Sequence, residues 1–500
     1  MVRAMPVTTT HAEYDRYRYR WQACRDLIEG RDAILRRCFD LSGINRRVSG
    51  SLYGPSLTQE DYIPRLSGQS DAEYRAYAMR AAFFGATGRT VDALAGMIMA
   101  KPANEVLPAP LDRFSEDITL AAQSLREFAQ LVVTEELSVT RVGVLVDYPA
   151  DVPNGLSRGD AEAMNIRPFM RMYKGESILN WRTAIIQGRR MLTKVVLKED
   201  FEASTDDEFS TEQACQMRVL DLFEGSYRVR IMNEKGELIS ESFPLMNGQP
   251  FNFIPFDIVG GYDVRKPLLM DLVDMNISHL RNSADYEHGL HFVALPTPVV
   301  AGVQLTEGQS LNIGGTSAWV FPDPQASANF LEFRGDGLQT IERAMDEKVQ
   351  RMAVLGARLL TDEKRTSEAT DTVAMRSAGE RSLLAASAND VSDTLRRCLG
   401  WMMQWVGGNP DAVKYALNID FGAARLNPQM LQQLIAAWQA DAISRETLFE
   451  NLQRGEIIAA DATYEDYEAQ VEQAGPSIEA PQPANDQPSG MSSLRRMLGL

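Results

Sequence analysis

Apolar residues recur at steps of three and four positions over two stretches in the second half of the chain. The first stretch places them on one side of a helix, at Leu338, Ile341, Met345, Val349, Met352, Leu355 and Leu359. The second does the same at Leu384, Ala388, Val391, Leu395, Cys398, Met402 and Trp405. The segment 361–371 between them has one alanine and no larger apolar residue. We therefore expect two long amphipathic helices, called here the first and second seams, on either side of a charged loop.

Helical spacing also appears elsewhere along the chain. The stretches that show it are 12–40, from Asp71 onward, from Gly88 to about Lys101, 119–137, from Pro267 towards Phe292, and 428–472. Ser70, with Glu73 three residues later, has the signature of a capping box, and Ser444 is placed to cap a helix. Helices are therefore expected to form most of the regular structure.

Shorter runs of apolar residues predict strands. Val142–Asp147 is typical of a buried strand, and 150–165 is rich in Gly, Pro, Asp and Asn, which predicts an exposed loop. Between 168 and 260 the pattern is mainly strand-like, at 193–197, 217–222 and 227–232, with a hairpin turn expected at 233–236. A small excursion of strands and turns is expected at 299–333. The fold class predicted is α+β, mainly helical, with an antiparallel sheet.

Composition narrows the function classes. A chain of 500 residues allows several units that each have a core. Its net charge of −17 argues against wrapping nucleic acid by neutralising phosphates. The four widely spaced cysteines indicate reduced thiols. The N-terminal stretch lacks the apolar core of a signal peptide, and no apolar run approaches the roughly 18 residues of a membrane span, so no membrane partner is expected.

Catalytic motifs are missing from the sequence. It contains no GxxxxGK[ST] phosphate-binding loop, no HExxH and no GxSxG. We therefore expect a protein that is not an enzyme and that has no cofactor and no metal.

Three of the four histidines, His279, His288 and His291, fall within one expected helix. His288 and His291 lie three residues apart and could face one metal ion together with Asp285 or Glu287, as in a metal-dependent hydrolase. The alternative is that they occupy polar, partly exposed positions near the helix end, where histidine interacts well with the helix dipole. The second interpretation is favoured, because a third ligand is missing.

Two other groups have a functional and a plain interpretation. Lys364 and Arg365 could touch a phosphate backbone, or could belong to a solvated loop between helices. The aromatic group Tyr14, Tyr17, Tyr19 and Trp21 could stack on nucleic-acid bases, or could pack in a core. Taken alone, the residues favour the plain interpretation in both cases.

Several phrases, taken in order, resemble the bacteriophage portal proteins, in particular the group first catalogued as a domain of unknown function. They are Tyr62-Ile-Pro-Arg-Leu66, the run 84–97 with Lys101-Pro102, Gly143-Val-Leu-Val-Asp-Tyr-Pro149, Asn180-Trp-Arg182, the runs 267–272 and 276–287, and Met352-Ala-Val-Leu-Gly-Ala-Arg-Leu-Leu360. The similarity runs from about Tyr62 to about Gly455.

The resemblance implies a subunit of a ring, dodecameric in mature particles, with a wing, a stem, a clip and a crown. The parts it implies are an N-terminal region and α+β wing at 1–265, a first stem helix at 266–298, a clip at 299–334, a second stem helix at 335–360, a tunnel loop at 361–372, a long kinked wing helix at 373–410, a helical crown at 411–474, and a tail at 475–500 with a short basic-apolar end. The kink is expected at Gly379 or Gly400.

The same resemblance implies a function and a site. The ring would form the channel at one capsid vertex through which double-stranded DNA is packaged and ejected, without sequence specificity. The implied partners are the terminase large subunit, a head-tail adaptor, and capsid and scaffold proteins. The implied location is the virion, with assembly in the host cytoplasm. The residues implied to face DNA are those of the tunnel loop, Asp362, Glu363, Lys364, Arg365, Thr366, Ser367 and Glu368.

Two consequences for packing follow, and two alternatives stay open. The first seam should meet the helix 267–294, in its own and in neighbouring subunits, and the second should cross outward into the wing. The alternatives are a metal-dependent hydrolase that uses His288 and His291, and a different head-tail ring of the virion. Head-tail adaptors are usually much shorter than 500 residues, which favours the portal.

Overall fold

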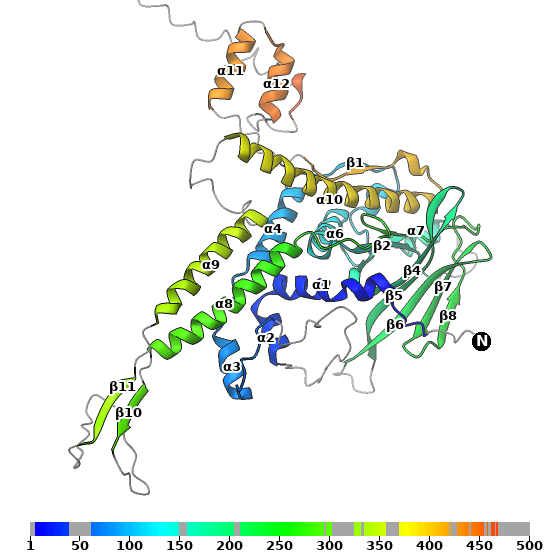
Figure 1. Ribbon diagram of the computed structural model, residues 1–500. Coiled ribbons are helices and arrows are strands. Elements are labelled where there is room, and N and C mark those ends of the chain that lie inside the picture. Colours follow the sequence, from blue (N-terminus) through cyan, green and yellow to red (C-terminus); the bar gives the residue numbers. More distant parts are fainter. Residues whose placement is uncertain are drawn as a thin grey trace, which may run out of the picture. The chain divides into compact units, whose positions relative to one another are not determined.

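The computed structural model divides the chain into two compact units, Met1–Asp420 and Phe421–Leu500 (Figure 1). The residues it describes are 6–39, 62–149, 158–204, 211–294, 297–302, 325–331, 335–356, 370–419, 421, 428–439, 442–454, 458, 462–465 and 467–468. Helices account for more residues than strands, so the α+β, mainly helical class predicted from the sequence is confirmed.

The N-terminal part of the first unit is helical. Its helices are α1 (Ala12–Glu29), α2 (Arg31–Phe39), α3 (Asp71–Arg80), α4 (Ala86–Met99), the short α5 (Leu111–Phe114) and α6 (Leu125–Val139). Gly30, at φ +100°, separates α1 from α2 within the helical stretch 12–40. Ser70 and Glu73 form the expected capping box at the start of α3.

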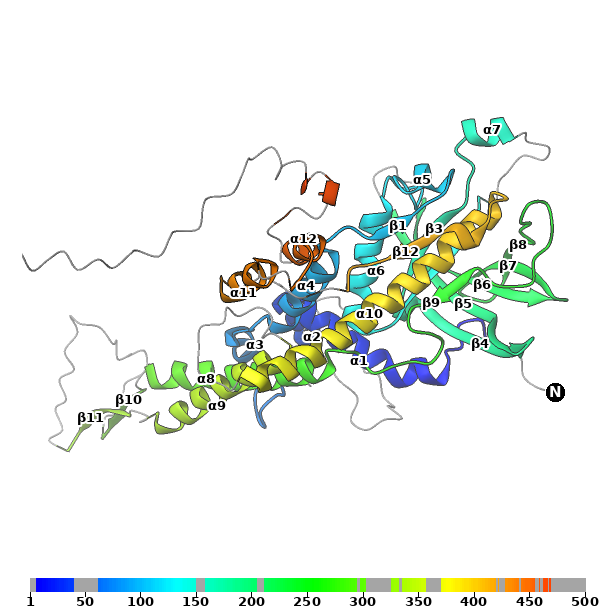
Figure 2. The same cartoon turned by 90° about the horizontal axis from the view of Figure 1, so that it is seen from above.

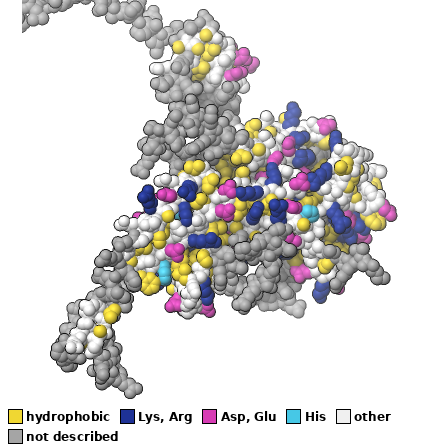
Figure 3. All heavy atoms as spheres, viewed as in Figure 1, with side chains coloured by type: hydrophobic (Ala, Val, Ile, Leu, Met, Phe, Trp, Pro, Cys, Tyr) yellow, Lys and Arg dark blue, Asp and Glu magenta, His cyan; other side chains and the backbone are white. Residues whose placement is uncertain are grey.

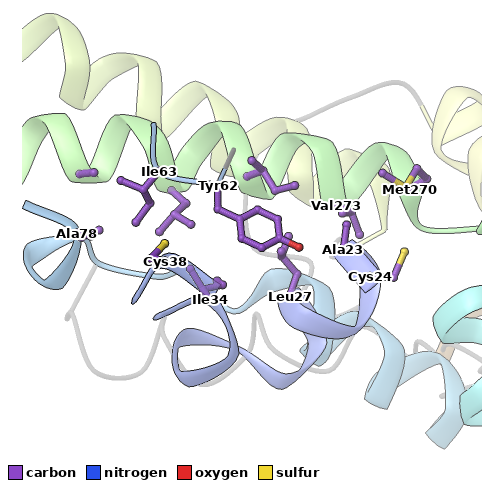
Figure 4. Packing of buried hydrophobic residues seen from close by; sticks show 14 of the residues in the cluster. Ala23, Cys24, Leu27, Ile34, Cys38, Tyr62, Ile63, Ala78, Met270 and Val273 are labelled. Carbon is purple, nitrogen blue, oxygen red and sulfur yellow. The ribbon is translucent and has the colours of Figure 1, made fainter. Parts of the chain in front are cut away.

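These helices enclose a core built from sequence-distant pieces. Figure 4 shows residues of α1, α2, α3 and the segment Tyr62-Ile63 packing against Met270 and Val273 of α8 (Met270–Ala294). Trp21 is fully buried here and Tyr17 nearly so, so these two aromatic residues pack in the core. The Tyr62 hydroxyl donates to Asp26 at 2.9 Å, and this hydrogen bond satisfies a carboxylate that is itself buried.

A three-stranded antiparallel sheet has the order β3–β2–β9. Its strands are β2 (Val142–Asp147), β3 (Phe169–Lys174) and β9 (Phe256–Ile258). The central strand β2 is buried along Val142–Val146, which explains its unbroken apolar run and confirms the predicted strand.

A second sheet has five antiparallel strands in the order β4–β5–β6–β7–β8. They are β4 (Ile178–Ile186), β5 (Arg189–Ser204), β6 (Thr211–Phe223), β7 (Ser226–Asn233) and β8 (Leu238–Ser242). The three runs predicted between 193 and 232 lie in β5, β6 and β7. The expected turn after β7 is closed by the Gly236 N–H, which donates to the Asn233 carbonyl at 2.9 Å, with Gly236 at φ +84°.

Buried ionic contacts tie the two sheets together at Glu199 of β5. Its carboxylate accepts from Arg218 Nε at 2.8 Å and from the Tyr173 hydroxyl of β3 at 2.5 Å. Burial works to raise the pKa of Glu199, but Arg218 and the hydrogen bonds outweigh it and lower that pKa to about 2. The carboxylate is therefore charged at neutral pH and holds β3, β5 and β6 together.

The rest of the first unit begins with α8, which is followed by the hairpin of β10 (Thr297–Ala301) and β11 (Ser327–Leu331). Then come α9 (Asp336–Leu355) and the 36-residue α10 (Thr370–Trp405). The unit closes with β12 (Lys414–Ala416), which pairs with β1 (Asn104–Val106).

Helix α10 packs along the body of the unit (Figure 2). All seven residues of the second seam are buried, and α10 contacts α6, β2, β9 and β12. The Ser392 hydroxyl accepts from the Leu417 N–H at 2.9 Å, which fixes the segment beside β12 against the helix. The expectation that the second seam packs on the α+β body is confirmed.

Two expectations about local structure are wrong. The helix expected from residue 119 begins at Leu125, because Leu120 and Ala122 have φ of 62° and 56°, and Ser124 caps it. The expected loop 150–165 contains the short helix α7 (Arg158–Ala163). Helix α10 is continuous past Gly379 and Gly400, and the kink expected at one of them stays a prediction.

The second unit contains α11 (Pro428–Gln439) and α12 (Arg445–Arg454) among its described residues. Ser444 caps α12 as predicted, since its Oγ accepts from the Thr447 N–H at 3.0 Å. Leu448 and Phe449 are buried, and the Phe449 ring packs against Tyr464 and Tyr467.

A glycine pair tests the packing of β2. A Cβ added at Gly143 would fall inside the contact distance of the Phe256 ring and 3.1 Å from Ile178 Cδ1. Gly143→Ala should therefore lower the free energy of unfolding by about 1–3 kcal/mol, the usual effect of overpacking. Gly96→Ala, on an exposed face of α4 with open space, should raise it by about 0.5–1 kcal/mol. Urea denaturation measures both; equal effects of the two substitutions would contradict the packing described.

Candidate functional site

Helices α8 and α9 form an antiparallel pair joined by the β10–β11 hairpin (Figure 1). Their direction follows from two contacts: Leu338 at the start of α9 meets Gly289 late in α8, and Lys348 meets Ser278 further back. A Cβ at Gly289 would lie 2.5 Å from Leu338 Cδ2, so a larger residue there would require the Leu338 side chain to move. The Lys348 Nζ donates to the Ser278 carbonyl at 3.0 Å.

The first seam of α9 faces this partner helix. Leu338, Ile341, Met345 and Val349 are half-buried, Met352 is fully buried, Leu355 is exposed, and Leu359 lies outside the described residues. The expectation that this seam meets the helix 267–294 of the same chain is therefore confirmed. The seam is less buried than that of α10, which leaves part of its apolar surface exposed in the single chain.

The outer face of α9 carries charges of both signs that pair with one another. Glu347 lies 3.7 Å from Arg343 and 3.8 Å from Arg351, each one helical turn away. All three side chains are exposed, so each pair contributes no more than about 0.5 kcal/mol. Because of these two ion pairs, Arg343 and Arg351 do not form a row of unpaired positive charges on this face. Figure 3 likewise shows Lys and Arg intermingled with Asp and Glu on the face of the body that it displays.

The residues predicted to touch DNA, Asp362, Glu363, Lys364, Arg365, Thr366, Ser367 and Glu368, lie outside the described residues. Their neighbours in the chain are described: α9 ends at Leu355 and the backbone of α10 begins at Thr370. The assignment of a tunnel loop to 361–372 stays a prediction.

His279 is buried in the body instead of lying partly exposed. Its ring packs on Phe84 with centroids 5.7 Å apart. Burial, and then the charge of Lys348, lower its pKa, so the neutral ring is favoured. The position serves the contact between α8 and the segment before α4.

The rings of His288 and His291 pack against aromatic neighbours. His288 lies between Tyr77 at 5.1 Å and Phe292 at 4.8 Å, and the Tyr77 hydroxyl donates to Asp285 at 2.5 Å. The hydrogen bond from Tyr77 therefore engages the Asp285 carboxylate, which the metal-dependent hydrolase alternative would need as a ligand. Within the described part of the chain, no three His, Cys, Asp or Glu side chains are grouped so as to hold a metal ion.

Arg265 connects the start of the α8–α9 pair to α6 and α10. Its Nη2 donates to Glu136 of α6 at 3.1 Å, and its Nη1 donates to Asp390 of α10 at 3.0 Å. The guanidinium lies over Gly260, at φ +70°, where any Cβ would collide with it. One side chain thus links the segment entering α8 to the two helices that cover β2.

Glu136 is the buried member of this group. Its side chain is 1% exposed, and burial raises its pKa to about 7 although Arg265 works to lower it and Asp390 adds to the rise. Arg141 lies close by, also buried, and donates to the Tyr262 carbonyl at 3.2 Å with its guanidinium over the Trp181 ring. The contact of Arg265 with Glu136 and Asp390, called here the junction, therefore has ionisable side chains where water is excluded.

Sequence reasoning missed this junction. Glu136, Arg265 and Asp390 are more than a hundred residues apart, and neither spacing nor composition joins them. The pattern gave one hint, since Glu136 falls among the apolar residues of α6. A charged residue on an apolar helix face indicates a buried partner but does not identify it.

One known protein family matches the part of the chain that contains α8, α9 and α10. The family described as "Domain of unknown function (DUF4055)" matches residues 267–406, which run from the start of α8 to the end of α10. No curated protein sequence matches the chain.

Solved structures of phage-like particles are similar to this chain at a distance. A chain in "Virion of native gene transfer agent (GTA) particle" has 13% identity and a TM-score of 0.36, covering 77% of this chain and 93% of its own. A chain in "Neck of native GTA particle computed with C12 symmetry" has 12% identity and a TM-score of 0.34, covering 73% and 88%. A chain in "Neck of empty GTA particle computed with C6 symmetry" has 12% identity and a TM-score of 0.35, covering 77% and 92%.

None of the helices described here combines the length and apolar character needed to cross a bilayer.

The raised pKa of Glu136 predicts a pH dependence. Between about pH 4.5 and 7 the folded chain holds a proton at Glu136 that the unfolded chain releases, so stability should fall as pH rises through this window. Glu136→Gln keeps an acceptor for Arg265 and removes the titration. The free energy of unfolding of the variant minus that of the wild type should rise between pH 4.5 and 7, by up to about 3 kcal/mol. Urea titrations across this range measure the difference; parallel curves would contradict it.

Proposed function

We propose that this chain is a bacteriophage portal protein, the subunit of a ring of twelve copies that forms a DNA channel at one capsid vertex. The observation that carries the proposal is the order of elements over 267–406: a helix, a strand hairpin, an antiparallel helix and then a long helix packed on an α+β body. This is the order of stem, clip, stem and wing helix that the resemblance of the sequence implies. The same residues are those that the family match covers.

The parts of the portal follow from this order. Helices α8 and α9 are the stem, the β10–β11 hairpin belongs to the clip at 299–334, and α10 is the wing helix after the tunnel loop 361–372. Residues 1–265 form the wing, and the crown lies within 411–474. The half-buried seam of α9 supports the assignment, because a stem helix in a ring has neighbours of its own kind to cover the remaining apolar surface.

The charge on α9 suits a channel that DNA must traverse. Each phosphate that a protein neutralises strengthens its hold on DNA, so a row of unpaired cations would retain the cargo. On α9 the arginines at 343 and 351 are paired with Glu347 of the same helix, and the whole chain carries −17. Such a surface lets DNA pass without gripping it.

The proposal assigns force generation to another chain. With no phosphate-binding loop in its sequence, the ring would serve as a passive conduit docked to the terminase large subunit, which hydrolyses ATP. A head-tail adaptor would replace that motor after packaging, and capsid and scaffold proteins would surround the ring. The protein would assemble in the host cytoplasm and remain in the virion.

Electron micrographs of the purified chain test the assembly. We expect rings with a central channel at micromolar concentration. A strictly monomeric species in the micrographs, together with a monomer mass in light scattering, would contradict the proposal.

Substitution of the tunnel loop tests the channel. Lys364→Ala with Arg365→Ala should leave ring assembly intact and change the amount of DNA packaged or retained per particle. Arg396→Ala, at an exposed arginine of α10 outside the proposed stem, is the control. Loss of rings in the double variant would assign Lys364 and Arg365 to subunit contacts instead.

A further inference from the structure

The five-stranded sheet ends in two strands that each have one neighbour among the described residues, β4 on one side and β8 on the other. An exposed strand edge presents unpaired N–H and C=O groups to any strand that can reach it, and proteins normally protect such edges with lysine, proline or a covering segment. The two edges of this sheet differ in how much of each is covered and in the charges beside them.

Strand β8 is exposed along its whole length. All five residues from Leu238 to Ser242 are exposed, and Leu238 and Ile239 keep 54% and 60% of their surface accessible. The strand contains neither lysine nor proline, but it has one bulge, at Ile239. Glu237 is exposed just before it, Glu241 lies within it and pairs with Arg228 at 3.0 Å, and exposed Lys235 lies in the preceding turn.

Strand β4 is covered over its first half only. The His11 N–H donates to the Leu179 carbonyl at 2.9 Å, and Asn180 Nδ2 donates to the Thr9 carbonyl at 2.9 Å. The His11 ring stacks on Trp181 with centroids 4.0 Å apart. The N-terminal segment thus protects β4 as far as Trp181.

The second half of β4, residues 182–186, is open and basic at its borders. Ile185 is 81% exposed, more than any other large apolar side chain among the described residues. Arg182 and Arg189 are exposed, and their side chains form no ion pair or hydrogen bond within the described part of the chain. The free half of β4 therefore combines an apolar residue with unpaired positive charge.

We propose that residues 182–186 of one copy pair with β8 of the next copy, so that the sheet continues from subunit to subunit. This inference deepens the proposed ring and rests on it. The two edges offer matching chemistry: outward-facing backbone groups, exposed Ile185 against Leu238 and Ile239, and Arg182 against Glu237. Because the five strands alternate in direction, β4 and β8 run the same way, and the contact is a parallel one.

The contact joins different surfaces of the two copies. A head-to-tail contact of this kind generates a ring when its rotation closes, whereas pairing of like edges would stop at a dimer. In the parallel sense the start of the open half of β4 lies beside the start of β8. With Arg182 beside Glu237, Ile185 lies level with Ser240, next to Ile239, which is the extra residue of a bulge in β8.

Cysteine cross-linking tests the pairing on the full chain. Ile185→Cys and Ile239→Cys are combined in a Cys215→Ser background, since the other three cysteines are buried. Within one chain the two edges are four strand spacings apart, roughly 19 Å, whereas a disulfide needs Cα atoms within about 7 Å. A bond can therefore form only between copies. Oxidation should convert the monomer band into a ladder of linked multimers on a non-reducing gel, reversed by reductant.

Further cysteine pairs test the register of the contact and serve as controls. Leu238→Cys and Ser240→Cys, each with Ile185→Cys, cover the neighbouring registers. Met164→Cys with Ile239→Cys, at a residue 57% exposed after α7, should stay monomeric. Linkage by Ile239→Cys alone would show that like edges meet and would overturn the head-to-tail contact. Rings in micrographs with no linkage in any register would overturn the inference and leave the proposed function standing, whereas absence of rings would count against the proposed function itself.

Discussion

Burial of one face of α10 is the interaction on which the first unit depends. Its seam from Leu384 to Trp405 is buried throughout, and the residues it meets come from α6, both strands β2 and β9, and the segment beside β12. Each large apolar side chain buried in this way contributes about 1.5–3 kcal/mol. Because these partners span residues 125 to 417, the helix packs against elements that lie far apart in the sequence. The ion pair of Arg397 with Asp257, at 2.5 Å, fixes the register between α10 and β9.

Local patterns in the sequence predicted most of the helices and the central strands. Steps of three and four identified α9 and α10, apolar runs identified β2 and the middle of the second sheet, and Ser70, Asn233–Gly236 and Ser444 gave correct caps and turns. The errors arose where backbone geometry overrides the pattern. Leu120 and Ala122 adopt positive φ inside an apparently amphipathic stretch.

The junction at Arg265 could not be predicted, because its members meet only through the fold. The histidines show that spacing alone can also suggest a site that the fold does not form. Their spacing was compatible with a metal, whereas the structure surrounds His279 and His288 with Phe84, Tyr77 and Phe292, which no spacing rule selects. The candidate tunnel loop rests on resemblance, while the helix pair that leads to it is visible in both sequence and structure.

The N-terminal segment that lies along β4 sets how much of that strand is available. Residues 6–11 occupy the edge as far as Trp181, through the His11 and Asn180 hydrogen bonds and the stacked His11 ring. Without these residues, the unpaired edge would extend from residues 182–186 to all nine residues of β4. Leu179 and Trp181 would then be exposed as well. A long, flat, apolar edge is prone to uncontrolled association. Residues 9–11 therefore protect this edge of β4 from pairing with a further strand.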